Sequence, residues 1–322
     1  MTESAGRHAA ASDVAEMLIL PAQQRILGDG ATPPEPPARS AGGRHANGNG
    51  RVGGAGPDPA ASVRAPGTQE RSGVAPAGQH RPSAVGDGSK LRLVWVYPDL
   101  LSTYGDRGNL LVLSRRARLR GIEVEATEVN ADQRVPSDGD IYLLGGGEDL
   151  PQILAANRLS NDGGLAAAVE RGAVVFAVCA GYQVVGHQFG GVEGEPVSGL
   201  GLLDITSGRG ERRGVGELVA DPDRALGLPT LSGFENHQGV TTIGPGARPL
   251  ATVTHGVGNG DGTEGAYAGK VLGTYMHGPA LARNPGLADL LLSWAVGPLP
   301  PIDPADEQWA ARLRSERLGS VS

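Results

Sequence analysis

The sequence predicts an α/β fold with a mostly parallel sheet over residues 89–298. Two runs, 91–96 and 173–178, are rich in valine and apolar apart from Arg92, as strands inside a sheet usually are. Strand and helix patterns alternate in the order β-α-β-β-α-β, which is typical of parallel sheets. Glycine or small residues follow the strands, so the carboxyl ends of the strands are where function is expected.

The elements follow from local periodicity and from turn residues. The predicted order is a strand at 91–96, a leucine-rich helix ending at Gly121, strands at 122–129 and 140–144, a helix at 164–170 and a strand at 173–178. Beyond Gly186 the apolar segments are short and separated by Gly, Pro and Asp, and they centre on Leu202, Val215, Leu231, Val240, Val253 and Val271. These segments predict antiparallel strands and hairpins that extend the same domain, ending in a strand at 270–275 and a helix at 286–296.

The chain divides into three parts by composition. Residues 1–88 are rich in Gly, Ala, Pro and Ser and contain no aromatic Phe, Trp or Tyr, so we expect them to be disordered. Their eight arginines balance eight acidic residues, which leaves the net charge of −7 to the remaining chain. An acidic domain argues against nucleic acid as a partner. Residues 299–322 form a tail with a helical pattern at 306–318.

Cysteine usage and hydropathy bear on the compartment. The chain has one cysteine, which excludes an internal disulfide framework. No apolar stretch has the length of a signal peptide or a membrane span. Together these features predict a cytoplasmic protein.

That single cysteine, Cys179, stands at the turn between a buried strand and a helix pattern. Ala177, Ala180 and Gly181 are small enough for a sharp turn, and a nucleophile elbow has this arrangement. A thiol at such a position is activated by the helix N-terminus and by a nearby histidine. A buried structural cysteine is the alternative, but the switch from strand to helix favours a nucleophile.

A thiol nucleophile needs a base. His277 follows the strand at 270–275 and would lie at the same edge of the sheet as Cys179, so it is the first choice. His237 is the second choice. His187 comes just after the elbow and should point away from the thiol, and His255 lies in a glycine-rich hairpin region.

Attack on an acyl carbon also needs hydrogen-bond donors for the developing oxyanion. We expect the backbone N–H of Ala180, together with that of Gly146 or Gly147, to provide them. The sequence has no P-loop motif, no dinucleotide-binding motif after the first strand and no Cys/His cluster with metal-ligand spacing. We therefore expect no cofactor or metal on this chain, and any ATP with its Mg²⁺ on a partner.

Five motifs in order resemble one family. They are Tyr104-Gly105-Asp106-Arg107-Gly108-Asn109, Gly145-Gly146-Gly147-Glu148-Asp149, Cys179-Ala180-Gly181-Tyr182-Gln183, Gly233-Phe234-Glu235-Asn236-His237 and Tyr275-Met276-His277-Gly278-Pro279. Over residues 91–296 the chain resembles class I glutamine amidotransferases of the branch shared with cobyric acid synthase, and within it the GatD-type subunits of lipid II isoglutaminyl synthase. The resemblance implies a flavodoxin-like sheet flanked by helices.

The resemblance also implies an activity. Cys179 would form a glutamyl thioester with L-glutamine, with His277 as the base, and water would release glutamate. Arg213 would bind the glutamine carboxylate, a task that suits a guanidinium, and Gln183 would contribute to the substrate site. Ammonia would pass to a MurT-type, Mur-ligase-like partner in a heterodimer, which would use ATP to amidate the D-glutamate of a lipid-linked acceptor in peptidoglycan synthesis.

Two positions depart from the family pattern. Pro279 stands where most triad enzymes of this class have a glutamate, so His277 lacks the usual orienting acid. The resemblance to the cobyric-acid-like branch implies either a Cys–His dyad or another acid, and Glu235 and Asp106 are the candidates for that acid. Ala177 replaces a glycine that many relatives have before the nucleophile.

Three other functions remain open from the sequence. The chain could supply ammonia to another acceptor, as in a cobyric-acid-type synthase, although no nucleotide-binding motif accompanies it here. A non-catalytic interaction module with the same fold is a second alternative, disfavoured by the presence of both Cys179 and His277. A cysteine hydrolase acting on peptides is the third, disfavoured by the five ordered motifs.

Overall fold

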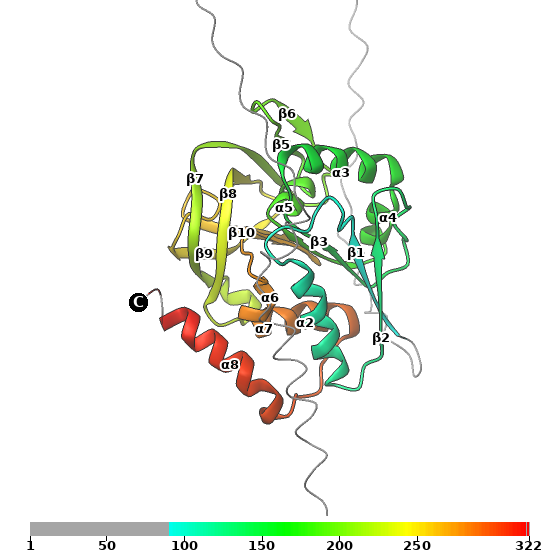
Figure 1. Cartoon of the computed structure of the whole chain (residues 1–322), viewed down its shortest axis with the longest axis vertical. Helices are drawn as coiled ribbons and strands as arrows, with labels where there is room; N and C mark the ends of the chain where they lie inside the picture. The colour runs from blue at the N-terminus through cyan, green and yellow to red at the C-terminus, as the bar shows by residue number, and fades with distance from the viewer. Residues whose placement is uncertain (1–89, 320, 322) are drawn as a thin grey trace, which may run out of the picture. The chain divides into compact units, whose positions relative to one another are not determined.

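The computed structural model describes residues 90–319 and residue 321 (Figure 1). The prediction of disorder for residues 1–88 lies outside the described residues. Within the described part, the strands join one mixed sheet of 11 strands.

The parallel half of the sheet has the order β2-β1-β3-β4-β11. Its strands are β1 (Leu91–Val96), β2 (Val124–Val129), β3 (Ile141–Leu144), β4 (Val174–Val178) and β11 (Val271–Thr274). All four neighbouring pairs in this half are parallel. Every residue of β3, β4 and β11 is buried, which explains their continuous apolar sequences. The predicted mostly parallel sheet is confirmed.

The other half of the sheet is mainly antiparallel, as the short segments after Gly186 predict. It contains β5 (Gln188–Gly190), β6 (Pro196–Ser198), β7 (Ile205–Pro222), β8 (Leu231–Ile243), β9 (Arg248–His255) and β10 (Thr263–Ala268). β7 and β8 pair along most of their length, with a register shift between Arg209 and Gly214. One expectation fails here, because Leu202 lies in a loop before β7.

The helices are α2 (Arg107–Arg118), α3 (Asp149–Asp162), α4 (Gly164–Glu170), α5 (Ala180–Val184), α6 (Ala280–Arg283), α7 (Pro285–Val296) and α8 (Pro304–Gly319), with a 3₁₀ turn η1 (Arg224–Leu226). α2, α6 and α7 contact one another on one side of the sheet, and α3, α4 and α5 form a second group (Figure 1). A helix, α8, is present where the tail has a helical pattern, and it buries none of its side chains.

The helix α3 was not predicted from the sequence. Its buried positions are Gln152, Ala155, Ala156 and Leu159, and Leu150 and Leu154 point to solvent. The apolar stripe therefore does not coincide with the buried face, so periodicity alone could not reveal this helix.

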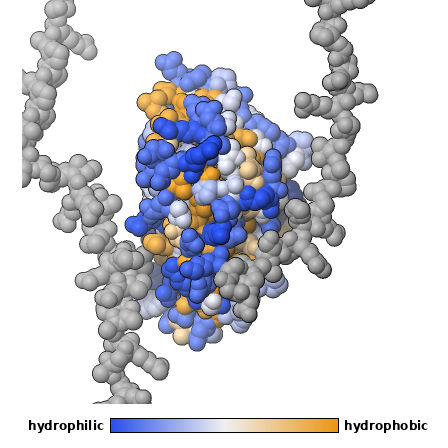
Figure 2. Space-filling view, turned by 90° about the vertical axis from the view of Figure 1, so that its right-hand side faces the viewer, coloured by the Kyte–Doolittle hydropathy of each residue, from blue (hydrophilic) through white to orange (hydrophobic). Residues whose placement is uncertain are grey.

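Surface hydropathy is mixed. The face shown in Figure 2 is mostly hydrophilic, with smaller hydrophobic areas between the polar residues. Among the described residues no helix is both long and apolar enough to span a membrane.

Candidate functional site

Cys179 lies at the carboxyl end of β4, at the start of α5. Its backbone has φ 52°, a left-handed conformation that a non-glycine residue adopts only under constraint. Its N–H donates to the carbonyl of Thr274 at 2.8 Å, and an added Cβ on Gly181 would lie 2.7 Å from Cβ of Leu144. The strand therefore turns sharply into the helix, in the shape that the sequence predicts. α5 is only five residues long, so its dipole is a small contribution.

His277 follows β11, the strand that pairs with β4. Thr274 is in register with Val178, so the two parallel strands end at one edge and bring their following residues together. The side chain of His277 is fully buried. Its backbone N–H and C=O both bond to Phe234 of β8, which holds the loop in place.

Asp106 is the carboxylate that lies beside His277. Its Oδ1 lies 3.3 Å from Nδ1 of His277, and its Oδ2 accepts a 2.6 Å hydrogen bond from the N–H of Gly146. The sequence left Asp106 and Glu235 open as replacements for the family glutamate, and the structure selects Asp106. Because a carboxylate at Nδ1 leaves Nε2 as the reactive nitrogen, this arrangement orients the imidazole for acid–base chemistry.

The charge state of His277 follows from this environment. Burial lowers the pKa of His277, but the hydrogen bond to Asp106 and the neighbouring Cys179 outweigh burial and raise the pKa to about 10. Nε2 is buried and has no hydrogen-bond partner within normal geometry among the described residues. His277 thus has one nitrogen engaged by Asp106 and one left to serve the thiol.

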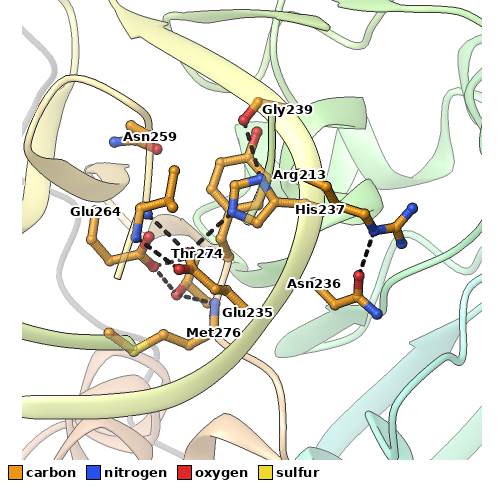
Figure 3. Close-up of polar contacts among 12 residues, drawn as sticks. Arg213, Glu235, Asn236, His237, Gly239, Asn259, Glu264, Thr274 and Met276 are labelled. Atoms are coloured by element: carbon orange, nitrogen blue, oxygen red, sulfur yellow. Dashed lines mark hydrogen bonds and ion pairs between the residues drawn. The ribbon is translucent and has the colours of Figure 1, made fainter. Parts of the chain in front are cut away.

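His237, the second choice for the base, has a different environment (Figure 3). Its Nε2 lies 3.3 Å from Oε2 of Glu235 and its Nδ1 lies 3.1 Å from the carbonyl of Gly239. The ring stacks on Tyr275 with centroids 3.7 Å apart. Both ring nitrogens are therefore occupied, which makes His237 unsuitable as the base.

The two remaining candidate histidines lie outside the pocket. His187 is past the end of α5, is exposed and pairs with Asp204 at 3.1 Å. His255 is an exposed residue at the end of β9. Neither lines the pocket beside Cys179.

A pocket of about 250 Å³ opens beside the thiol. Its lining includes five of the predicted site residues, namely Gly147, Cys179, Ala180, Gln183 and Arg213. His277 is not part of this lining, but Cys179 is its neighbour. The size suits a small polar molecule better than a folded macromolecule.

One predicted oxyanion donor needs correction. The N–H of Gly146 is occupied by Asp106, so it cannot stabilise an oxyanion in this structure. Gly146 instead serves close packing, since an added Cβ would lie 2.5 Å from Cε1 of His277. Of the two alternatives, Gly147 is the one that lines the pocket with Ala180.

Arg213 and Gln183 lie at different depths of the pocket. Arg213 is exposed and lies within the irregular stretch of β7 between Arg209 and Gly214, and its Nε donates to Oδ1 of Asn236 at 2.6 Å (Figure 3). The amide of Gln183 is held at both ends, since Oε1 accepts from Gln152 at 2.8 Å and Nε2 donates to the Tyr275 hydroxyl at 3.1 Å. This side chain is thereby fixed in one orientation.

Sequence reasoning missed Arg209, which also lines the pocket and pairs with Asp149 at 3.1 Å. Arg209, Arg212 and Arg213 lie close together in the sequence of β7. Which of them face the pocket depends on the register shift in this strand. The described residues contain no group of three or more His, Cys, Asp or Glu side chains placed to hold a metal ion.

Curated proteins similar to this chain include GatD subunits and cobyric acid synthases. The chain is 38% identical over 201 residues to the lipid II isoglutaminyl synthase (glutamine-hydrolyzing) subunit GatD of Staphylococcus aureus (strain N315), covering 61% of this chain and 81% of that protein. It is 33% identical over 215 residues to the corresponding GatD of Streptococcus pneumoniae (strain ATCC BAA-255 / R6), covering 64% and 81%. Cobyric acid synthase of Sphingopyxis alaskensis is 35% identical over 178 residues, covering 53% and 34%.

The family model for the CobB/CobQ-like glutamine amidotransferase domain matches residues 92–285. That segment begins in β1 and extends past His277, so it contains Asp106, Cys179 and the pocket. Together with the nucleophile elbow and the His277–Asp106 pair, the match shows that this chain belongs to the CobB/CobQ-like glutamine amidotransferase family.

Proposed function

We propose that this chain is the glutaminase subunit of a lipid II isoglutaminyl synthase. The observation that carries the proposal is the placement of Cys179, on a strained elbow, beside the His277–Asp106 pair at the edge of a pocket that also contains Arg213. The two GatD relatives, of which the chain covers 81%, support the choice of this synthase.

The first half-reaction forms a thioester. Sγ of Cys179 attacks the side-chain amide carbon of glutamine while His277 takes the thiol proton. The N–H groups of Ala180 and Gly147 stabilise the oxyanion of the tetrahedral intermediate. His277 then gives its proton to the amide nitrogen, the C–N bond breaks, and ammonia leaves.

The second half-reaction restores the enzyme. His277 removes a proton from water, and the resulting hydroxide attacks the thioester carbon. The C–S bond breaks, glutamate is released, and the proton returns to sulfur. Asp106 touches His277 rather than the substrate, so it acts by holding the ring and by stabilising the imidazolium that forms twice in each cycle.

Glutamine recognition falls to the open side of the pocket. Arg213 binds the α-carboxylate, since a guanidinium offers two parallel N–H donors to a carboxylate. Its Nε is already bound to Asn236, so the terminal nitrogens face the ligand. Gln183, held by Gln152 and Tyr275, contributes to the wall near the amide.

Ammonia passes to a Mur-ligase-like partner of the MurT type in a heterodimer. The partner holds ATP and Mg²⁺, activates the α-carboxyl of D-glutamate in lipid II and converts it to D-isoglutamine. This chain needs no cofactor of its own for the glutaminase step, because thiol, base and oxyanion donors suffice for amide hydrolysis.

A second candidate is an ammonia donor for a cobyric-acid-type synthase. The similarity to cobyric acid synthase favours it, but the chain covers only 34% of that relative and 81% of the GatD relatives. The extent of the match therefore supports the lipid II synthase as the first choice.

The test is glutamate release from L-glutamine by the purified chain, alone and with a MurT-type partner and ATP. We expect release in both cases, with stimulation by the partner. Cys179→Ala should reduce release by about 10³-fold or more while it still binds the partner. Release that continues in Cys179→Ala would contradict the thioester mechanism, and release that only another synthase stimulates would favour the second candidate.

A further inference from the structure

Tyr104 stands at the pocket in an unfavourable backbone conformation. Its φ is 54°, and Gly105 after it has φ 82°, so two consecutive residues are left-handed directly before Asp106. A glycine tolerates this region but a tyrosine does not, and a non-glycine residue stays there only where its contacts hold it. The side chain of Tyr104 is therefore expected to make contacts that matter to the site.

The ring of Tyr104 packs on the catalytic histidine. Its centroid lies 5.0 Å from that of His277 at an interplanar angle of 70°, an edge-on geometry favourable for aromatic rings. It also lies 6.4 Å from the ring of Phe234. Tyr104 lines the pocket and is 44% exposed, whereas His277 is fully buried. Tyr104 thus separates the imidazole from the pocket on this side.

The hydroxyl of Tyr104 belongs to a second chain of contacts. It accepts a 2.6 Å hydrogen bond from Nδ2 of Asn236, whose Oδ1 accepts the 2.6 Å bond from Nε of Arg213. Figure 3 shows Asn236 and Arg213 pointing toward each other away from the Glu235–His237 pair. One tyrosine therefore contacts the acid–base group with its ring and reaches the arginine of the pocket through one amide.

The backbone around Tyr104 connects it to Asp106 as well. The N–H of Thr103 donates to the carbonyl of Gly146 at 3.2 Å, and the N–H of Asp106 donates to the carbonyl of Thr103 at 3.3 Å. Gly146 in turn donates to Asp106. A change in the conformation of Tyr104 would displace the carboxylate that orients His277.

We propose that Tyr104 is a positioning residue that holds His277 against Asp106 and, through Asn236, couples the imidazole to Arg213. Its ring acts on turnover, because it keeps the histidine oriented and shielded from water. Its hydroxyl acts on substrate binding, because it fixes the guanidinium through Asn236. The second half of this proposal rests on the proposed function of Arg213, and the first half does not.

Three variants separate these roles. Tyr104→Phe keeps the ring and removes the hydroxyl. Tyr104→Asn removes the ring, and asparagine adopts the left-handed region readily, so no backbone strain is added. Tyr267→Phe is the matched control, since it deletes a buried tyrosine hydroxyl that bonds Asp223 outside the pocket.

Two measurements apply to all three variants. The first is the NMR titration of His277 in histidine-labelled protein, assigned by the signal that disappears in His277→Gln. This measurement needs no substrate. The second is kcat and KM for glutamine hydrolysis.

In Tyr104→Asn we expect the His277 midpoint to fall by about one pH unit and kcat to fall about tenfold. In Tyr104→Phe we expect KM to rise several-fold, with kcat and the midpoint close to wild type. Tyr267→Phe should match wild type in every value. A Tyr104→Asn protein with the midpoint and kcat of the control would overturn the proposal.

Two further outcomes remain decisive. If Tyr104→Asn does not fold, as judged by near-UV circular dichroism, a double-mutant cycle of Tyr104→Phe with Asn236→Ala takes its place, and additive effects on KM would refute the coupling. If wild type hydrolyses no glutamine, the proposed function fails, and the His277 titration still decides whether Tyr104 positions the histidine.

Discussion

Two buried histidine–carboxylate pairs lie among residues 90–319, and only one of them adjoins the thiol of Cys179. His277 and Asp106 are 3.3 Å apart beside the thiol, and His237 and Glu235 are also 3.3 Å apart on β8. Both histidines are nearly inaccessible to solvent. Distance and burial alone would not distinguish the two pairs.

The difference lies in the second ring nitrogen and in the neighbours of the carboxylate. Nε2 of His277 has no hydrogen-bond partner within the described residues, and Cys179 is its neighbour. Nδ1 of His237 is engaged by the carbonyl of Gly239, and Glu235 also accepts from the N–H groups of Val257 and Gly258. In the first pair, Nε2 of His277 is available to exchange a proton with the thiol. In the second pair, the side-chain nitrogens of His237 and both carboxylate oxygens of Glu235 are hydrogen-bonded, and these bonds tie β8 to the loop after β9.

The largest difference in activity between the two pairs is expected when each histidine is replaced by glutamine. His277→Gln removes the acid–base group, and we expect kcat to fall by about 10³-fold or more. His237→Gln should keep kcat within about tenfold of wild type and lower the melting temperature, because Glu235 loses its partner and Tyr275 loses the stacked ring. Steady-state kinetics and thermal unfolding of both variants test this, and equal losses of kcat would contradict the assignment.

Removing the carboxylate charge should separate the pairs by pH dependence. His277 must be unprotonated to take the thiol proton, and its pKa is raised to about 10, so the acidic limb of kcat/KM, on which the rate rises with pH, should extend up to that range. Asp106→Asn should lower kcat about 100-fold and move this limb toward the ordinary histidine value of 6.5, because the raising interaction is lost. Glu235→Gln is the matched control.

For Glu235→Gln we expect no displacement of the acidic limb and a loss of stability of about 2 kcal/mol from the buried hydrogen bonds. A pH–rate profile of each variant from pH 6 to 10.5 provides the measurement. An unchanged limb in Asp106→Asn would show that another group sets it.

The smallest expected effect concerns a third buried acid, Glu264, and the pH dependence of stability. Burial raises the pKa of Glu264 to about 7, against the hydrogen bonds from Thr274 and Tyr275 that lower it. The native state then keeps this proton between pH 4.5 and 7 while the unfolded chain releases it, so the stability contributed by the protonated form is complete below pH 4.5 and lost as the pH rises through 7.

Glu264→Gln removes that titration. As the pH rises from 5 to 8, the unfolding free energy of the variant should increase by about 3 kcal/mol relative to that of wild type. Urea unfolding at a series of pH values measures the difference. Parallel pH dependence of the two proteins would mean that Glu264 is ionised throughout this range.

Much of the fold was predictable because its signals are local. The strands β1, β3, β4 and β11 are short, mainly apolar runs. Nearly all of their residues are buried, which confirms the burial that their apolar sequences predict. α3 was not predictable, since its buried face includes Gln152 and its leucines at 150 and 154 face solvent. Periodicity reports a helix only where the apolar and the buried faces coincide.

For the site, the sequence by itself singled out Cys179 as the candidate nucleophile and His277 as the candidate base. Cys179 and His277 each follow a buried parallel strand, and because such strands end at one edge of a sheet, residues 98 positions apart can be expected to meet. The small residues around Cys179 and the glycines after β3 are requirements of close backbone approach, which a sequence displays directly.

Only the tertiary structure decided which acid orients His277 and which glycine is left for the oxyanion. Asp106 and Glu235 are equally plausible as sequence, and the choice depends on where the turn after β1 folds against the end of β11. The same contact occupies the N–H of Gly146 and leaves Gly147. Hydrogen bonds between groups distant in sequence depend on geometry to within a fraction of an ångström, and no local pattern encodes that precision.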